Sequence, residues 1–279
     1  GMKFYAWFNP FRVARSAQDY GNLSADNPAA VHPEWAVALN GGARWLNPGI
    51  PAVRDYVIDG ISEVVRRYDI DGVILDDYFY PYPSSGNFDD EAAFNAYGKG
   101  YSSKSDWRRN NINVFMKDLH RSLKGIKSGV SFGASPFGIW RNRKNDSAGS
   151  ATSGLSSYDS TYADSRKWIA DRSVDFIAPQ IYWPMDYSVA SYRVLVDWWA
   201  KQVKGTGVKL YIAQAAYKIG ISSPAAWSDP GEYPKQIRYN RSVPQVGGSI
   251  HFRMGSLLDN KLGIVGILKN DLYKNPARP

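Results

Sequence analysis

Short apolar runs alternate with amphipathic segments along the whole chain, and this alternation constrains the fold more than any other feature. The apolar runs are expected to be strands and cover residues 3–10, 73–75, 130–137, 174–183, 209–217 and 246–254. Between them, apolar residues recur at three- and four-residue steps, the pattern of amphipathic helices. These helices are predicted at residues 51–68, 105–123, 160–172, 192–203, 230–242 and 259–273. Strands that alternate with helices predict a parallel α/β architecture in a single domain, residues 1–279.

The order of long and short connections favours a barrel over an open sheet. Long polar loops follow the predicted strands, whereas the turns after the helices are tighter. In TIM-like barrels, the loops after the strands build the active site at one face. A closed (β/α)8 barrel has eight units, however, and only six can be counted here. Either two units escape the pattern or the barrel is incomplete.

Two adjacent acids stand at the end of the most buried predicted strand. Residues 73–75 (Val-Ile-Leu) form a short apolar run that leads directly into Asp76 and Asp77. Such a run is typical of a central parallel strand covered on both faces. Neighbouring side chains on a regular strand point to opposite faces, but both acids can reach the barrel mouth where the backbone turns. They are candidate catalytic residues; the alternative is a structural pair that caps the following loop.

Other predicted strand ends carry polar and aromatic side chains suited to a glycan. The candidates for substrate binding are Asn9, Arg12, Tyr78, Tyr80, Ser135, Arg141, Gln180, Tyr182, Trp183, Gln214, Tyr217 and Arg253. Taken singly, each is more often structural than functional, but their recurrence at successive strand ends favours a common site. Aromatic residues make up 14% of the chain. Surplus rings can stack on sugars, although most must belong to the core.

Composition argues against several classes of function. The net charge is +8, but no basic run or nucleic-acid-binding motif accompanies it, so attraction to an anionic polymer is at least as good an explanation. With no cysteine and three scattered histidines, thiolate chemistry and disulfides are excluded, and a histidine-based metal site or Ser-His-Asp triad is disfavoured. No metal or cofactor is therefore expected. No apolar run approaches the roughly 18 residues of a membrane span, and no signal peptide is found.

A few local patterns allow finer predictions. Asn40-Gly41-Gly42 between two apolar runs predicts a hairpin. Asp89 and Asp90 are expected to start a short helix as N-terminal caps rather than to bind a metal. Pro179 predicts a bulge or strand end within the fourth strand. His120 is expected on the surface or in packing, and His251 could point inward or pack.

Several motifs resemble those of the bacterial glycosyl-hydrolase-like family 10. They are Ala6-Trp-Phe-Asn-Pro-Phe-Arg12, His32-Pro-Glu-Trp35, Trp45-Leu-Asn-Pro-Gly49 with Arg54-Asp-Tyr56, Asp71-Gly-Val-Ile-Leu-Asp-Asp-Tyr-Phe-Tyr-Pro81, Ser135-Pro-Phe-Gly-Ile-Trp-Arg-Asn142 and Ala178-Pro-Gln-Ile-Tyr-Trp183. The resemblance implies a TIM-like barrel acting on bacterial glycans, in the cell envelope or secreted. It also implies that this chain carries barrel strands three to eight and lacks the first two βα units.

The adjacent acids further resemble the carboxylate pairs of N-acetylhexosaminidases that use substrate assistance. That resemblance implies that Asp76 orients the acetamido group of the sugar and that Asp77 is the general acid, with a pKa raised by burial and by its neighbour. Asp159, Asp164 and Asp186 remain open as more distant partners.

The predicted function is a metal-independent glycoside hydrolase for cell-wall or related N-acetylated glycans. The alternative is a non-catalytic glycan-binding barrel; a polysaccharide deacetylase is weaker, because it would need a metal site. The sequence indicates no oligomeric state.

Overall fold

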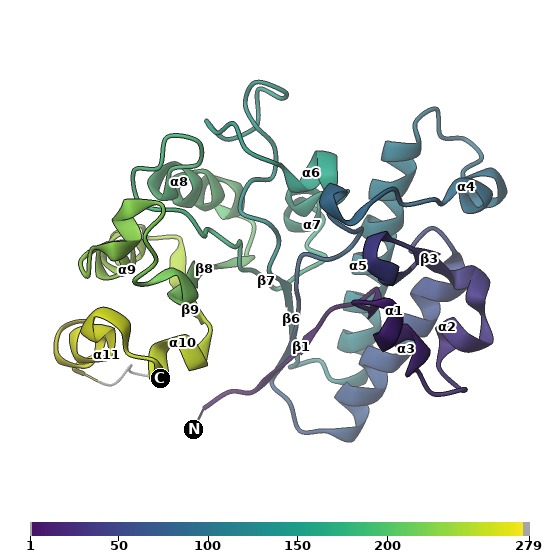
Figure 1. Ribbon diagram of the computed structural model, residues 1–279, viewed down its shortest axis with the longest axis horizontal. Coiled ribbons are helices and arrows are strands. Elements are labelled where there is room, and N and C mark those ends of the chain that lie inside the picture. The colour runs from purple at the N-terminus through teal and green to yellow at the C-terminus, as the bar shows by residue number, and fades with distance from the viewer. Residues whose placement is uncertain (1, 276–279) are drawn as a thin grey trace. The chain divides into compact units, whose positions relative to one another are not determined.

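The computed structural model describes residues 2–275 (Figure 1). Contacts within the chain divide it into two compact units. Unit 1 comprises the chain up to Ala134 together with Ser156–Asp175, and unit 2 comprises Ser135–Leu155 together with the chain from Phe176 onward. The prediction of a single domain remains a prediction.

Unit 1 is built on three parallel strands in the order β1 (Tyr5–Phe8), β5 (Gly72–Leu75) and β6 (Ser131–Ala134). Phe8 pairs with Leu75, and Leu75 pairs with Ala134, so the three strands end level with one another. The residues that follow β1 and β5 are therefore brought together at one edge of the sheet, the edge that carries the active site in parallel α/β folds.

Two long helices in unit 1 pack against each other, and both were expected from their apolar stripes. Helix α3 (Pro51–Arg67) begins with proline at its first turn, where the missing N–H has no helical partner to lose. Helix α5 (Lys104–Ile126) is capped by the hydroxyl of Ser103. Most residues of the predicted apolar stripes are buried, namely Val53, Val57, Ile61, Val65, Ile112, Phe115, Met116, Leu119 and Leu123. Tyr56 and Tyr68, which the spacing also placed on the stripe of α3, are exposed instead.

A small antiparallel sheet completes unit 1, with strand order β2 (Arg12–Ala14), β4 (Arg44–Leu46) and β3 (Ala36–Ala38). The hairpin predicted at Asn40–Gly42 joins β3 and β4, and φ is +67° at Gly41 and +77° at Gly42, values that favour glycine. The shorter helices of this unit are α1 (Ala17–Gly21), α2 (Pro28–Val31), α4 (Glu91–Tyr97), α6 (Ser157–Ser160) and α7 (Ser165–Ala170), with 3-10 turns at Pro33–Trp35 and Pro83–Ser85.

Unit 2 has three parallel strands in the order β7 (Phe176–Ile177), β8 (Lys209–Ala215) and β9 (Val246–Phe252). Strand β7 is much shorter than the predicted 174–183, because it ends before Pro179, as that proline indicated. Helices α8 (Tyr192–Val203) and α9 (Glu232–Ser242) occupy their predicted positions, and 3-10 turns lie at Ala216–Lys218 and Ala225–Ser228.

The long last helix predicted at 259–273 is wrong. The chain instead forms α10 (Met254–Leu258), a turn at Lys261–Gly263, α11 (Ile264–Ile267) and a π-helical turn at Leu268–Leu272. Asn260, Leu262 and Gly263 all have positive φ, which breaks a right-handed helix.

Within residues 2–275, the parallel strands of both units follow chain order and alternate with helices. This arrangement confirms the predicted α/β class and the count of six strand–helix units. No helix in the described part of the chain is both long and apolar enough to cross a membrane.

Candidate active site

The two acids predicted as catalytic lie together in unit 1, at the carboxyl end of β5. The strand ends at Leu75, and the backbone N–H of Asp76 donates to the carbonyl of Phe8 at 3.1 Å, which ties the start of the loop to β1. Only 4% of Asp76 and 4% of Asp77 is exposed. A carboxylate this buried is costly unless it is hydrogen-bonded or protonated, so the contacts of each acid decide its chemistry.

Asp76 has neutral hydrogen-bond donors and a raised pKa. Its Oδ2 accepts from Nδ2 of Asn9 at 3.2 Å, and its Oδ1 accepts from the backbone N–H of Tyr78 at 3.4 Å. Burial, and then the negative charge of Asp77, raise the pKa of Asp76 to about 7, against the smaller lowering effects of these donors and of the Arg12 guanidinium. Asp76 therefore carries a proton in a large fraction of molecules near neutral pH.

Asp77 accepts a hydrogen bond from the hydroxyl of Tyr82, five residues along the same loop. Burial and the charge of Asp77 raise the pKa of Tyr82 far above its ordinary value, so this hydroxyl is a permanent donor. Tyr82 is a site residue that the sequence reasoning missed. Its position could have indicated it, since Tyr82 directly follows the Tyr78–Pro81 segment after the two acids.

Arg12 and Tyr78 form the side of the site. The Arg12 guanidinium carbon lies 4.8 Å from the centre of the Tyr78 ring, and the Arg12 backbone N–H donates to Oδ1 of Asn9 at 3.2 Å. Tyr78 also meets Tyr82 edge-on at 5.7 Å. A hollow of about 420 Å³ next to them is lined by Asn9, Arg12, Val13, Ala14, Arg15 and Asp19. Asn9, Arg12 and Tyr78 are thus brought together with the acids as predicted.

Tyr80, predicted to bind substrate, has a different environment. Its side chain is fully buried, its hydroxyl accepts from Nδ2 of Asn111 at 3.4 Å, and its ring meets Phe88 and Tyr162 edge-on, each at 5.2 Å. A residue enclosed in this way supports the loop through packing and cannot touch a ligand from solvent.

The polar residues of unit 2 that were predicted to bind substrate make structural contacts, most of them with backbone carbonyls. Ser135 donates through Oγ to the carbonyl of Ala178 at 2.8 Å, and Gln180 donates through Nε2 to the carbonyl of Ser135 at 2.9 Å. Arg141 forms an ion pair with Asp146 at 3.1 Å within its polar loop.

Gln214 is fully buried in a polar network of unit 2. Its Nε2 donates to Oε1 of Gln236 at 3.3 Å, and its Oε1 accepts from Nδ2 of Asn240 at 3.4 Å. Glu232, a buried acid that the sequence reasoning missed, joins the network by accepting from Gln236 at 2.9 Å and from the backbone N–H of Met185 at 2.7 Å. This network links α9 to β8 and satisfies its own polar groups, as buried polar groups require.

Aromatic residues of unit 2 gather around the carboxyl end of β9, where Phe252 is the last residue of the strand. Tyr182 lies edge-on to Tyr217 at 5.8 Å and stacks with Phe252 at 6.1 Å. Tyr217 is 41% exposed and Phe252 48% exposed, so both present ring surface to solvent. Trp183 instead packs edge-on against Phe137 at 5.4 Å, and the exposed Arg253 follows Phe252 directly. Phe252 is the member of this cluster that sequence reasoning missed.

The acids left open as distant partners have structural contacts. Asp186 forms ion pairs with Arg193 at 3.0 Å and Lys235 at 3.4 Å on the surface. Asp164 caps helix α7, and Asp159 accepts from the hydroxyl of Ser156 at 2.8 Å.

The remaining acid and histidine predictions have mixed outcomes. Helix α4 starts after Asp90 as expected, but the Asp90 carboxylate does not cap it, because it forms a buried two-point ion pair with Arg108. His120 packs beside Asp175 at 3.4 Å. His251 lies between the hydroxyls of Tyr233 at 2.6 Å and Tyr273 at 3.1 Å, and burial lowers its pKa. Within residues 2–275, no three histidines and acids lie close enough together to hold a metal.

A parallel α/β fold with paired buried carboxylates at a strand end is the arrangement expected of a barrel-type glycoside hydrolase. The chain belongs to the family Glycosyl hydrolase-like 10, whose model matches residues 1–229. It is 48% identical over 279 residues to the glycosyl hydrolase YngK of Bacillus subtilis strain 168, a match covering 99% of this chain and 54% of that protein. It is 42% identical over 266 residues to the glycosyl hydrolase DigH of Escherichia coli strain K12, covering 91% of this chain and 60% of that one.

The chain thus spans a little more than half the length of these relatives. Among solved structures, the PgaB (BpsB) glycoside hydrolase domain of Bordetella bronchiseptica matches with a TM-score of 0.58 and 15% identity, over 96% of this chain and 74% of that chain. This likeness shows the fold, which is an incomplete TIM-like α/β barrel fold of six strand–helix units.

Proposed function

We propose that this protein hydrolyses N-acetylated glycans of the bacterial cell wall or closely related polymers, with Asp76 and Asp77 as its catalytic residues. The observation that carries the proposal is the buried carboxyl pair at the end of β5, one member of which has a pKa of about 7. Membership of a glycosyl-hydrolase-like family supports the reaction class. A polymer of this kind also favours the cell envelope or the secreted space as the place of action.

The contacts of the pair favour a division of roles opposite to the one implied by the resemblance. Asp76 is suited to be the general acid, since a group with a pKa near the working pH carries a proton and can release it. Asp77 accepts from Tyr82 and is suited to accept a further N–H, that of the sugar's acetamido group. The acetamido oxygen then attacks the anomeric carbon as the glycosidic bond breaks, and the proton of Asp76 passes to the leaving oxygen. Water, which gives a proton back to Asp76, then attacks the anomeric carbon of the cyclic intermediate and restores the acetamido group.

The surroundings of the pair fit a sugar ring. Asn9 holds Asp76 in place, and Tyr78 with Arg12 offers a flat polar wall beside the acids. Carbohydrate sites combine such aromatic surfaces with a few fixed polar groups. In unit 2, the exposed rings of Tyr217 and Phe252 are further surfaces on which a sugar can stack.

Release of reducing ends from purified cell-wall glycan strands tests the proposal. Asp76→Asn and Asp77→Asn should each lower the rate by at least about a hundredfold, the range of general acid–base catalysis. Asp186→Asn, a surface acid paired with Arg193, is the matched control and should keep full activity. Chemically de-N-acetylated strands should not be cleaved, because they lack the internal nucleophile.

Two outcomes would count against the proposal. Cleavage of de-N-acetylated strands at the normal rate would exclude substrate assistance. Tight binding of glycan strands without any release of reducing ends, at every pH between 5 and 8, would favour a glycan-binding barrel without turnover.

A further inference from the structure

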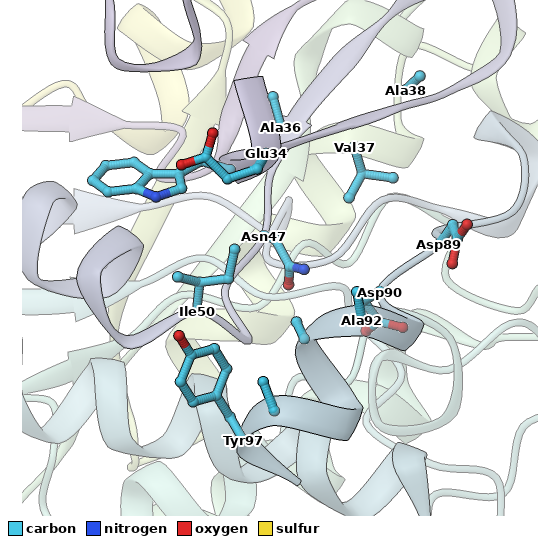
Figure 2. Close-up of a pocket in the computed structure, with 13 residues that line it drawn as sticks. Glu34, Ala36, Val37, Ala38, Asn47, Ile50, Asp89, Asp90, Ala92 and Tyr97 are labelled. Atoms are coloured by element: carbon cyan, nitrogen blue, oxygen red, sulfur yellow. The ribbon is translucent and has the colours of Figure 1, made fainter. Parts of the chain in front are cut away.

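A second hollow lies in unit 1, and none of its lining residues belongs to the carboxylate site. Its volume is about 620 Å³, and Figure 2 shows many of the side chains around it. The lining residues come from β3 and the turn before it, from the segment between β4 and α3, and from helix α4 with the two residues before it: Glu34, Trp35, Ala36, Val37, Ala38, Asn47, Ile50, Asp89, Asp90, Ala92, Ala93, Ala96 and Tyr97. This set is called the strand–helix groove below.

The groove runs along the open edge of β3. Strand β3 is the last strand of the sheet β2-β4-β3, so one of its edges has no neighbouring strand. Ala36, Val37 and Ala38 all line the groove, although successive side chains on a strand point to opposite faces. A hollow against one face would meet every second residue, whereas a hollow at the edge meets all three.

The hydrogen-bond pattern shows which backbone groups face this edge. Asn47 N–H donates to the Trp35 carbonyl at 2.8 Å, and Leu39 N–H donates to the Ala43 carbonyl at 3.0 Å. In an antiparallel ladder, alternate residues bond to the partner strand. Trp35 and Leu39 bond to the β4 side, so the backbone groups of Ala36 and Ala38 point away from β4. Ala36 N–H is used by a local turn to Pro33. The carbonyl of Ala36 and both backbone groups of Ala38 therefore point to the open edge of β3, along which the groove runs.

The opposite wall is a helix face made of small residues. Ala92, Ala93 and Ala96 of α4 line the groove, and Figure 2 shows Ala92 and Tyr97 across from Val37 and Ala36. Alanine side chains leave room for a main chain to lie between helix and strand. A strand edge facing a helix is the arrangement by which some domains accept an extended peptide as an added strand.

Exposed carboxylates flank the groove. Glu34 has 64% of its side chain exposed, with Nδ1 of His32 at 3.2 Å from its carboxylate, and the exposed Asp89 lies at another part of the rim. Asp90 contributes little charge, because Arg108 and Lys104 neutralise it. In a chain of net charge +8, two exposed acids beside an apolar groove favour a cationic ligand.

We propose that the strand–helix groove binds an extended cationic peptide segment as a fourth strand beside β3. Small or β-branched residues lie in the middle of the segment, against Ala92, Ala96 and Val37. Lysine or arginine at its ends reaches Glu34 and Asp89. The main chain of the peptide bonds to Ala36 and Ala38, a pattern of alternating N–H and C=O groups that a sugar polymer lacks. This inference does not depend on the proposed hydrolase activity.

Fluorescence anisotropy with a fluorescein-labelled, end-capped Lys-Ala-Val-Ala-Lys peptide tests the proposal on the intact chain. The matched peptide Glu-Ala-Val-Ala-Glu and a lysine peptide with N-methylated backbone amides are the ligand controls. Each should bind at least about tenfold more weakly, the equivalent of one or two charge-assisted or backbone hydrogen bonds. Equal binding of all three peptides, or no binding of the lysine peptide, would overturn the proposal.

Protein variants locate the binding. Ala96→Phe fills the groove and should weaken binding at least about tenfold, whereas Asn95→Phe, on the same helix but outside the lining, should leave it unchanged. Ala38→Pro removes the outward N–H, a change that edge strands tolerate, and should also weaken binding. Far-UV circular dichroism confirms that each variant is folded.

Three further outcomes would contradict the proposal. One is undiminished binding to Ala96→Phe. Another is displacement of the lysine peptide from the groove by N-acetylated oligosaccharides, which would make it a sugar subsite. The third is a protein dimer that Ala96→Phe dissociates, which would mean that a second copy of the chain occupies the groove.

Discussion

Replacing Asp76 with asparagine should make the folded protein more stable at alkaline pH than the unmodified chain. The pKa of Asp76 is about 7 in the folded protein, against an ordinary value of 3.8. A group whose pKa is raised by folding contributes stability that is fully present below pH 3.8 and is lost as the pH rises through 7. The unmodified chain therefore loses this contribution on going from acid to alkaline pH, whereas the variant has no carboxyl group to ionise there.

The size of the effect follows from the two pKa values. The pKa of Asp76 is about 7 in the folded state and 3.8 in the unfolded state. This difference lowers the unfolding free energy of the unmodified chain by about 3 kcal/mol between pH 5 and pH 8.5. The asparagine loses one acceptor, because Asn9 and the Tyr78 N–H both donate to the carboxylate. That loss costs about 1 kcal/mol at either pH. Since about 1.6 kcal/mol of the linkage cost is already present at pH 5, the variant should be slightly more stable than the unmodified chain at pH 5 and about 3 kcal/mol more stable at pH 8.5.

Urea denaturation at the two pH values, followed by tryptophan fluorescence, measures this difference. Ser62→Ala is a suitable control, since it removes a buried hydrogen bond of 2.9 Å to Ser122 but no titrating group, and its effect should be the same at both pH values. An Asp76→Asn effect that is also the same at both values would refute the reasoning. It would mean that the carboxyl of Asp76 is already ionised at pH 5 in the folded protein.

Three other substitutions test contacts that lie within one unit each. Asp90→Asn should lower the unfolding free energy by about 3 kcal/mol in urea titrations, because it leaves the Arg108 guanidinium without its buried counter-ion. Gly138→Ala should lower the melting temperature measured by calorimetry and cost about 1–3 kcal/mol, since its Cβ would lie 2.4 Å from the Gln180 carbonyl oxygen. Burial raises the pKa of Asp175, but hydrogen bonds outweigh it and lower the pKa to about 2, so Asp175→Asn should destabilise the fold at pH 7 and have progressively less effect as the pH falls from 4 towards 2.

Two of these substitutions, at Asp90 and Gly138, have a counterpart that should do little. Asp106 pairs with Arg109 but is largely exposed, so Asp106→Asn should change stability by less than about 1 kcal/mol. Gly266→Ala places a Cβ in open space. If Asp90→Asn and Asp106→Asn were equally mild, the Asp90 ion pair would not be a buried one in solution.

The parts of the site that sequence reasoning located are those fixed by local order along the chain. A short apolar run followed by Asp76 and Asp77 predicts a strand end with two acids, and the register of β1 and β5 brings Asn9 beside them. Tyr78 follows in the same loop. These positions depend on strand ends, and parallel strands bring their ends to one edge of a sheet.

Other residues could not be assigned, because their environment depends on distant parts of the chain. Tyr80 is polar and lies two residues after Tyr78, but Phe88 and Tyr162 enclose it. Gln214 follows the pattern of an active-site residue at a strand end, but side chains of α9 satisfy its amide. Alternation along a strand gives the face on which a side chain lies and not what covers that face.

The point at which β5 ends explains how the adjacent residues Asp76 and Asp77 can lie in one site. On a continuing strand, the two side chains would point to opposite faces, and one of them would meet the layer of helices. Because the ladder ends at Leu75, the loop is free to place both acids in one buried region, where each has its own donor: Asn9 for Asp76 and Tyr82 for Asp77. Two buried like charges so close together favour one shared proton over two full charges. The uncharged amide of Asn9 donates to Asp76, and the hydroxyl of Tyr82, which does not ionise, donates to Asp77. These donors leave the shared proton on Asp76. A general acid beside an orienting carboxylate requires this asymmetry.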